Sequence, residues 1–290
     1  MPARGRTGGH RPCSGPGKRG LSCQSGAGGP RPGGAAGSDV LGGREGRQNR
    51  SVLDDSEVQR ALVIAAHPDD VDFSAAGTIA GWTDAGIEVV YCIVTDGDAG
   101  GHDDAVPRSE MAPLRRKEQT AAAACVGVSD LRFLGYPDGQ VEATLGLRKD
   151  LARVIRQVRP DRLVCPSPER NYARIGVSHP DHRAVGSAAL DAVYPDARNP
   201  YAFGELRTDE GLEPWSVREV WLPGGPVPNR YVDMTGTFDR KLAALRAHES
   251  QTGHMDKLEE FLRTRLAAAA AAGGLPEGSL AETFQVLDTA

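Results

Sequence analysis

The chain has 290 residues, 34 of them basic and 39 acidic, and the charge is unevenly distributed. Residues 1–50 hold 15 of the 36 glycines and nine basic residues but only two acidic ones, whereas the remainder carries a net charge of −12. This acidic remainder argues against nucleic acid or an anionic membrane as the main partner. No segment has the length of a transmembrane span, and the N-terminus lacks the apolar core of a secretory signal, so we expect no integral membrane protein.

The composition predicts one folded domain behind a tail. Residues 1–55 are expected to be a disordered Gly/Arg-rich tail, because they contain no apolar run to bury, and residues 56–290 a single domain. Cys92, Cys125 and Cys165 each lie alone in an apolar segment, without a CxxC pair. Unpaired thiols of this kind are typical of a reducing compartment, so we expect a cytoplasmic protein. A homo-oligomer is compatible with this composition.

Short apolar segments alternate with helical ones along the domain. The expected strands are residues 61–66, 87–95, 131–134, 162–165, 217–222 and 230–233. The expected helices are residues 73–85, 114–126, 145–158, 183–193, 237–249 and 255–272. This alternation is typical of βαβ crossovers and predicts an α/β fold, a Rossmann-like and mostly parallel sheet with helices on both faces.

Two short motifs fall where such a sheet binds ligands, beyond the carboxyl ends of its strands. His67-Pro68-Asp69-Asp70 follows the first strand directly, and His179-Pro180-Asp181-His182 ends the loop after the fourth. Either motif alone is also typical of a turn that caps a helix. Their expected position on one rim of the sheet favours a metal site instead.

Imidazole and carboxylate together suit zinc or a similar divalent metal such as Fe²⁺. A catalytic zinc usually has three protein ligands and an open position for water. Two histidines and one carboxylate fill these positions, and His67, Asp70 and His182 are the natural choice. Asp69 and His179 are then left as acid–base groups beside the metal.

The two motifs resemble the signature motifs of the LmbE/PIG-L de-N-acetylases, a family that includes N-acetylglucosaminyl-phosphatidylinositol de-N-acetylase and the deacetylases of mycothiol and bacillithiol biosynthesis. Further similar stretches are Thr95–Gly100, Arg115-x-x-Glu118, Gly135–Gly139 and His248–Gln251. The resemblance spans about residues 60–255. It implies an LmbE-like fold and a zinc-dependent hydrolysis of an N-acetyl, or other N-acyl, amide on a small amino-sugar-like substrate, which releases a free amine and acetate.

The resemblance also implies roles for single residues. The metal ligands it implies are His67, Asp70 and His182. Asp69 corresponds to the general base, and His179 to the group that assists at the oxyanion or the leaving group. Arg115 and Asp138 match positions that touch substrate. The place of Asp181 in its motif indicates that it orients a ligand histidine or caps the next helix.

One departure and three alternatives stay open. The mycothiol-pathway enzymes have a tyrosine two residues before the second motif, where this chain has Val177, which argues against mycothiol precursors as the substrate. One alternative is an amidase that acts on a larger thiol conjugate or a natural-product intermediate. Another is a metal-stabilised sugar-binding protein without turnover, which would not need Asp69. The third, a non-haem iron oxygenase, usually has its two histidines and carboxylate on a β-barrel, unlike the βα alternation here.

Overall fold

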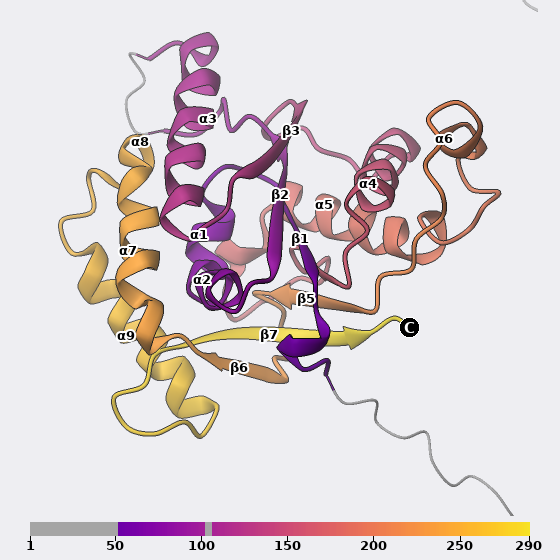
Figure 1. The fold of residues 1–290 in the computed structure, drawn as a ribbon. Coiled ribbons are helices and arrows are strands. Elements are labelled where there is room, and N and C mark those ends of the chain that lie inside the picture. Colours follow the sequence, from indigo (N-terminus) through magenta and orange to yellow (C-terminus); the bar gives the residue numbers. More distant parts are fainter. Residues whose placement is uncertain (1–51, 102–105) are drawn as a thin grey trace, which may run out of the picture. The chain divides into compact units, whose positions relative to one another are not determined.

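The computed structural model describes residues 52–101 and 106–290, so most of the predicted tail lies outside the described residues. Seven strands form one sheet in the order β3-β2-β1-β4-β5-β7-β6 (Figure 1). Their bounds are Arg60–Ala65 (β1), Glu88–Thr95 (β2), Asp130–Tyr136 (β3), Arg162–Val164 (β4), Glu219–Pro223 (β5), Arg230–Asp233 (β6) and Ala281–Asp288 (β7). Strands β1 to β5 pair in parallel, and β7 runs antiparallel to β5 and β6. The predicted mostly parallel sheet is confirmed.

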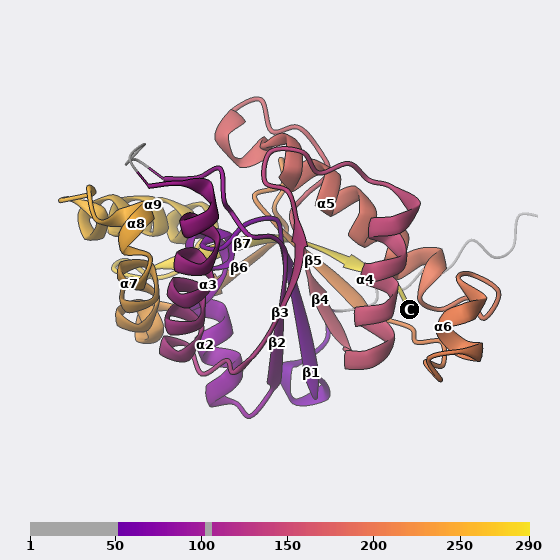
Figure 2. The same cartoon turned by 90° about the horizontal axis from the view of Figure 1, so that it is seen from above.

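Helices cover both faces of this sheet. Their bounds are Asp70–Ser74 (α1), Ala76–Asp84 (α2), Arg108–Cys125 (α3), Leu145–Val158 (α4), Pro180–Asp191 (α5), Gly204–Thr208 (α6), Phe238–Ala247 (α7), Glu249–Thr252 (α8) and Leu258–Ala272 (α9). Figure 2 shows α4 and α5 on one face, and α2, α3 and α7 on the other. Within the described ranges, no helix is long and apolar enough to cross a membrane.

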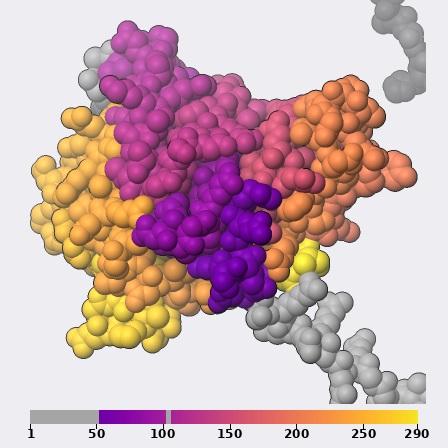
Figure 3. Space-filling model, in the orientation of Figure 1, coloured from indigo at the N-terminus to yellow at the C-terminus, as the bar shows by residue number. Residues whose placement is uncertain are grey.

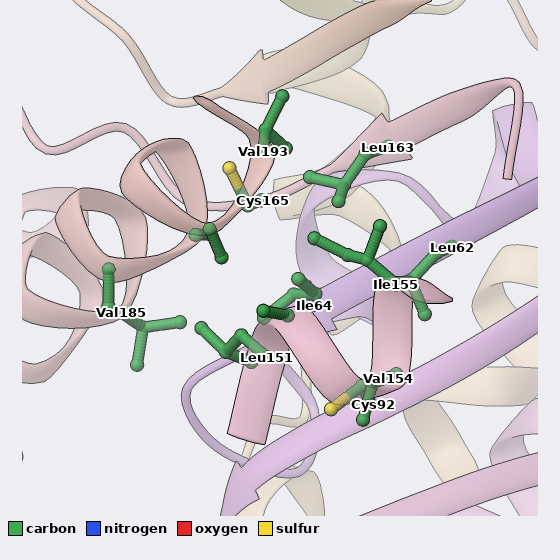
Figure 4. Close-up of a cluster of buried hydrophobic side chains, with 14 of the residues drawn as sticks. Leu62, Ile64, Cys92, Leu151, Val154, Ile155, Leu163, Cys165, Val185 and Val193 are labelled. Atoms are coloured by element: carbon green, nitrogen blue, oxygen red, sulfur yellow. The ribbon is translucent and has the colours of Figure 1, made fainter. Parts of the chain in front are cut away.

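The central strand β1 is buried on both faces, as its continuous apolar run predicts. Leu62 and Ile64 pack with α4 and α5 on one side, where Leu151 and Ile155 meet them (Figure 4). Ala61, Val63 and Ala65 face α2 and α3 on the other side. Leucines of α7 and α9 form a third cluster. Helix α7 packs against α3, and Figure 3 shows this orange segment beside the magenta one.

Several predicted element bounds were wrong. The helix expected at 114–126 begins at Arg108 and continues through Pro113, which gives up only one backbone hydrogen bond near the helix start. The helix expected at 183–193 begins at Pro180, because proline suits the first helical position. The helix expected at 73–85 is two helices separated at Ala75, where ψ is 0°. Strand β7 and helix α6 were not predicted.

The fold also reaches slightly further toward the N-terminus than the predicted domain boundary. The backbone N–H of Leu53 donates to Glu219 at 3.0 Å, and Asp55 pairs with the buried Arg162 at 2.6 Å. The Arg162 guanidinium itself lies over the rings of both Trp82 and Trp221, which contact each other edge to face. Contacts with the sheet therefore begin before residue 56.

Gly186 allows α5 to lie directly against the loop after β4. A Cβ atom at Gly186 would overlap the carbonyl oxygen of Pro166. Because this neighbour is backbone and not a flexible side chain, α5 and the loop would have to move apart. We expect G186A to lower the free energy of unfolding by about 1–3 kcal/mol. Gly81 of α2 is the matched control, because a Cβ there meets open space; G81A should be neutral or add about 0.5–1 kcal/mol. Urea denaturation measures both variants, and equal stability of the two would contradict the close contact.

Candidate active site

The two motifs meet at the carboxyl ends of β1 and β4, on either side of the point where the strand order reverses. Strand β1 leads directly to His67, and the first turn of α5 carries His182. Asp70, at the start of α1, lies between them: its Oδ2 is 3.3 Å from Nδ1 of His67, and its Oδ1 is 3.0 Å from Nε2 of His182. The structure thus brings the three predicted metal ligands together.

In His67 and in His182, the ring nitrogen that does not face Asp70 has a partner of its own. Nε2 of His67 lies 3.1 Å from a carboxylate oxygen of Asp181 and 3.1 Å from one of Asp138. Nδ1 of His182 lies 3.2 Å from the carbonyl oxygen of Val177. Such partners fix the ring orientation and the tautomer, so that Nδ1 of His67 and Nε2 of His182 are available as ligand atoms. Two imidazoles and one carboxylate fit zinc or a similar divalent ion.

Two other sets of donor atoms also cluster around His67: one joins it with His179 and His182, the other with Asp138 and Asp181. The Asp181 carboxylate already accepts hydrogen bonds from the backbone N–H of Gly139 and of Val141. This favours Asp181 as a partner that orients His67. It does not cap α5, because the cap is His179, whose Nδ1 accepts from the N–H of Asp181.

The histidines and carboxylates of this cluster lie close enough to shift one another's pKa. Burial lowers the pKa of His67, but the carboxylates of Asp70 and Asp138 outweigh it and raise that pKa to about 11. Burial acts against the charge of Asp70 too, yet His182 and His67 hold its pKa well below the ordinary range. Without metal, His67 is therefore protonated and Asp70 ionised at neutral pH.

Metal binding should consequently release protons. A histidine ligand must be neutral, and His67 carries a proton at every pH below about 11 in the metal-free protein. Asp70 also raises the pKa of His182, the second histidine ligand, against the effect of burial. We expect zinc binding at pH 7 to release at least one proton and the apparent affinity to rise with pH. Calorimetric titrations in buffers of different ionisation enthalpy count the protons. An observed enthalpy that is the same in all buffers would contradict this assignment.

Asp69 adopts an unusual backbone conformation for a residue other than glycine, with φ at 86°. Its N–H donates to the side-chain oxygen of Gln119 at 2.8 Å, and its carboxylate accepts from Arg115 at 3.0 Å. Burial raises the pKa of Asp69 to about 7, against the opposing charge of Arg115. A fixed carboxylate with a pKa near neutrality is suited to take a proton from water.

His179 lies at the exposed edge of the cluster. Its ring centroid is 5.0 Å from that of His67 and 5.4 Å from that of His182. Burial and the charge of these two histidines lower the pKa of His179. Because its Nδ1 accepts from the backbone N–H of Asp181, the neutral ring carries its proton on Nε2. Such a ring can donate a hydrogen bond to a developing oxyanion.

The two residues predicted to touch substrate are both buried. Arg115 is 3% exposed and donates to the Asp69 carboxylate as well as to two backbone carbonyl groups. Asp138 is 8% exposed, and its carboxylate contacts His67 and accepts from the backbone N–H of Ala99. The structure thus places Arg115 against the predicted base Asp69 and Asp138 against the predicted metal ligand His67, and their contact with substrate stays a prediction.

A buried network behind Asp69 was not predicted. Nε2 of His248 lies 2.8 Å from Oδ2 of Asp72, which accepts from the side-chain nitrogen of Gln119 at 2.9 Å. Both His248 and Asp72 are fully buried. Since Gln119 also binds the backbone N–H of Asp69, the network fixes the loop that carries this residue. The only sequence signal for this network was that His248 begins the stretch His248–Gln251, which resembles the de-N-acetylase family.

Comparisons with known proteins agree with this geometry. A family model described as PIG-L, GlcNAc-PI de-N-acetylase, matches residues 62–193. The chain is 35% identical over 212 residues to diacetylchitobiose deacetylase of Thermococcus kodakarensis, covering 72% of this chain and 77% of that protein. It is 34% identical over 204 residues to probable N-acetyl-alpha-D-glucosaminyl L-malate deacetylase 2 of Bacillus cereus, covering 68% and 86%. The solved structure of N,N'-diacetylchitobiose deacetylase from Pyrococcus horikoshii superposes with a TM-score of 0.73 at 33% identity, covering 81% of this chain and 85% of that one.

Proposed function

Because the chain belongs to the PIG-L family of de-N-acetylases, we propose that it hydrolyses the N-acetyl amide of a small amino-sugar-like molecule and releases a free amine and acetate. The observation that carries this proposal is the convergence of His67, Asp70 and His182, with Asp69 and His179 beside them, on the ligand-binding rim of the sheet. The two deacetylases from Thermococcus kodakarensis and Bacillus cereus are named for acetylated sugar substrates, and this chain matches 77% and 86% of their length. Both similarities support the substrate class.

The proposed cofactor is Zn²⁺ held by His67, Asp70 and His182, and Fe²⁺ suits the same donors. When bound, such an ion lowers the pKa of a water molecule towards about 7 and polarises the amide carbonyl. The supporting observation is the donor set itself, in which each ring turns one nitrogen toward Asp70 and has its other nitrogen engaged.

Residues of the chain itself move the protons and stabilise the developing charge. Asp69 takes a proton from the attacking water as the water oxygen bonds to the amide carbon. Nε2–H of His179 donates a hydrogen bond to the oxygen on which negative charge develops. When the carbon–nitrogen bond breaks, the proton held by Asp69 passes to the departing amine. Arg115 and Gln119 keep Asp69 in place through both transfers.

Two broader assignments complete the proposal. Residues 56–290, together with Leu53 and Asp55 that contact the sheet before them, form the catalytic domain, and the enzyme works in the cytoplasm on a small molecule. Cys92, Cys125 and Cys165 are free thiols, which supports a reducing compartment.

A screen of N-acetylated amino sugars, including N-acetylglucosamine and diacetylchitobiose, tests the proposed function. The expected result is equimolar release of primary amine and acetate, lost after chelation and restored by zinc. Cleavage of larger conjugates alone would replace this proposal with the amidase alternative. Binding of the sugars without release of amine would leave a binding protein.

A further inference from the structure

A cavity of about 590 Å³ adjoins the candidate metal centre, a volume typical of small-molecule sites. Asp70 and His182 form part of its wall, so a molecule that occupies it is within reach of the predicted metal. The cavity continues past the ends of β1 and β7 to α9, which lies beside β6 and β7 (Figure 1). Much of this far wall is apolar, with Leu266, Ala268 and Ala269 of α9 among its members.

Two arginines turn the far part of this cavity positive. Arg265, on α9, is half-buried, and Arg174, in the loop before α5, is exposed; both line the cavity. Neither guanidinium forms a hydrogen bond or an ion pair with any residue that the structure describes. Arg263, two residues before Arg265, differs: it pairs with Glu259 at 3.0 Å and stacks on Phe238 outside the cavity.

The carboxylate of Glu282 does not neutralise Arg265 and Arg174. Glu282 also lines the cavity, but its oxygens accept from the Lys241 ammonium at 2.7 Å and from the backbone N–H of Gly77 and Thr78. Burial and the like charge of Arg174 lower the pKa of Arg265, and only Glu282 acts in the opposite direction. A half-buried cation beside a second cation, over an apolar wall, is stabilised when an anion binds.

We propose that Arg265 and Arg174 form an anion subsite, which binds a carboxylate or phosphate group on the amino-sugar substrate while its N-acyl group lies at the metal. The guanidinium fork matches both oxyanions, because it can donate two parallel hydrogen bonds to either. This inference rests on the proposed function and makes it more specific: the preferred substrate is an anionic N-acetylated amino sugar rather than a neutral one.

Binding of deacetylated products tests the subsite without any turnover. The probes are neutral glucosamine, its 1-phosphate and 6-phosphate, and muramic acid, which carries a carboxylate. Calorimetry on the zinc-loaded protein should show at least one anionic probe binding about 10–100-fold more tightly than glucosamine, the usual worth of a hydrogen-bonded charge pair. The probe that binds most tightly separates phosphate from carboxylate recognition.

Three variants identify the residue responsible. R265Q should remove most of this advantage, and R265K should keep part of it, because lysine retains the charge without the fork. R263Q is the matched control on the same helix and should bind all probes as the unmodified protein does. The proposal is overturned if no anionic probe binds more tightly than glucosamine, or if R265Q and R263Q give equal affinities. Failure of the proposed function would appear separately, as absence of acetate release from every N-acetylated sugar.

Discussion

Replacing Asp69 with asparagine is expected to lower turnover by about 10²–10⁴-fold, the usual contribution of a positioned base, while the metal content stays near one ion per chain. The amide has almost the same shape but cannot take a proton from water. The side chain of Asp69 bonds to Arg115, and its backbone N–H to Gln119, so neither contact involves a predicted metal ligand. D69N should therefore leave the metal site intact.

The control for this variant is D84N, which changes an exposed aspartate that pairs with Arg240 on the surface. It should alter neither turnover nor metal content. Steady-state kinetics and elemental analysis on the same samples separate the outcomes. Full turnover in D69N would mean that another group activates the water, and loss of metal in D69N would show that Asp69 is itself a ligand.

Replacing its neighbour, Asp70, should have a different and equally large effect. The Asp70 carboxylate lies between the two ligand histidines, at 3.3 Å from His67 and 3.0 Å from His182. An amide removes the negative charge that attracts the cation. Because loss of a mere supporting partner usually weakens metal affinity about 10–100-fold, loss of this ligand should cost at least as much.

Competition with a chelator of known affinity measures this change in D70N. Turnover should fall with occupancy and recover in part when zinc is added in excess, a recovery that D69N should not show. D70N that keeps full affinity while D69N loses its metal would reverse the two assignments. The two neighbouring aspartates thus have distinct signatures although their side chains are chemically identical.

The parallel part of the fold could be predicted because its signals are local. The run from Ala61 to Ala66 is apolar throughout, and every position of β1 after Arg60 is buried, as expected of a strand covered on both sides. Strand β7 was missed because Glu282 lies buried near its start. Lys241 and the backbone N–H groups of Gly77 and Thr78 stabilise this carboxylate there, and partners 41 or more residues away are invisible to a local pattern.

The candidate site, too, could be predicted from the sequence only in part. The positions of His67, Asp70 and His182 follow from two motifs at strand ends, and these residues do come together. The orientation of Asp138 and Asp181 toward His67 depends on how the β3–α4 loop and the start of α5 meet at β1, which the sequence does not encode in any local pattern. The link from His248 through Asp72 and Gln119 to Asp69 likewise joins three separate parts of the chain, since Asp69 and Asp72 lie in the same turn.

The position of a bound metal ion tests the central assignment most directly. Crystals of the zinc-loaded protein, measured at the zinc absorption edge, reveal the ion as a single anomalous peak. We predict that peak at about 2.0–2.2 Å from Nδ1 of His67, a carboxylate oxygen of Asp70 and Nε2 of His182, the usual zinc–ligand distances. A peak among His67, Asp138 and Asp181, or one that lies beyond the reach of Asp70, would contradict the assignment.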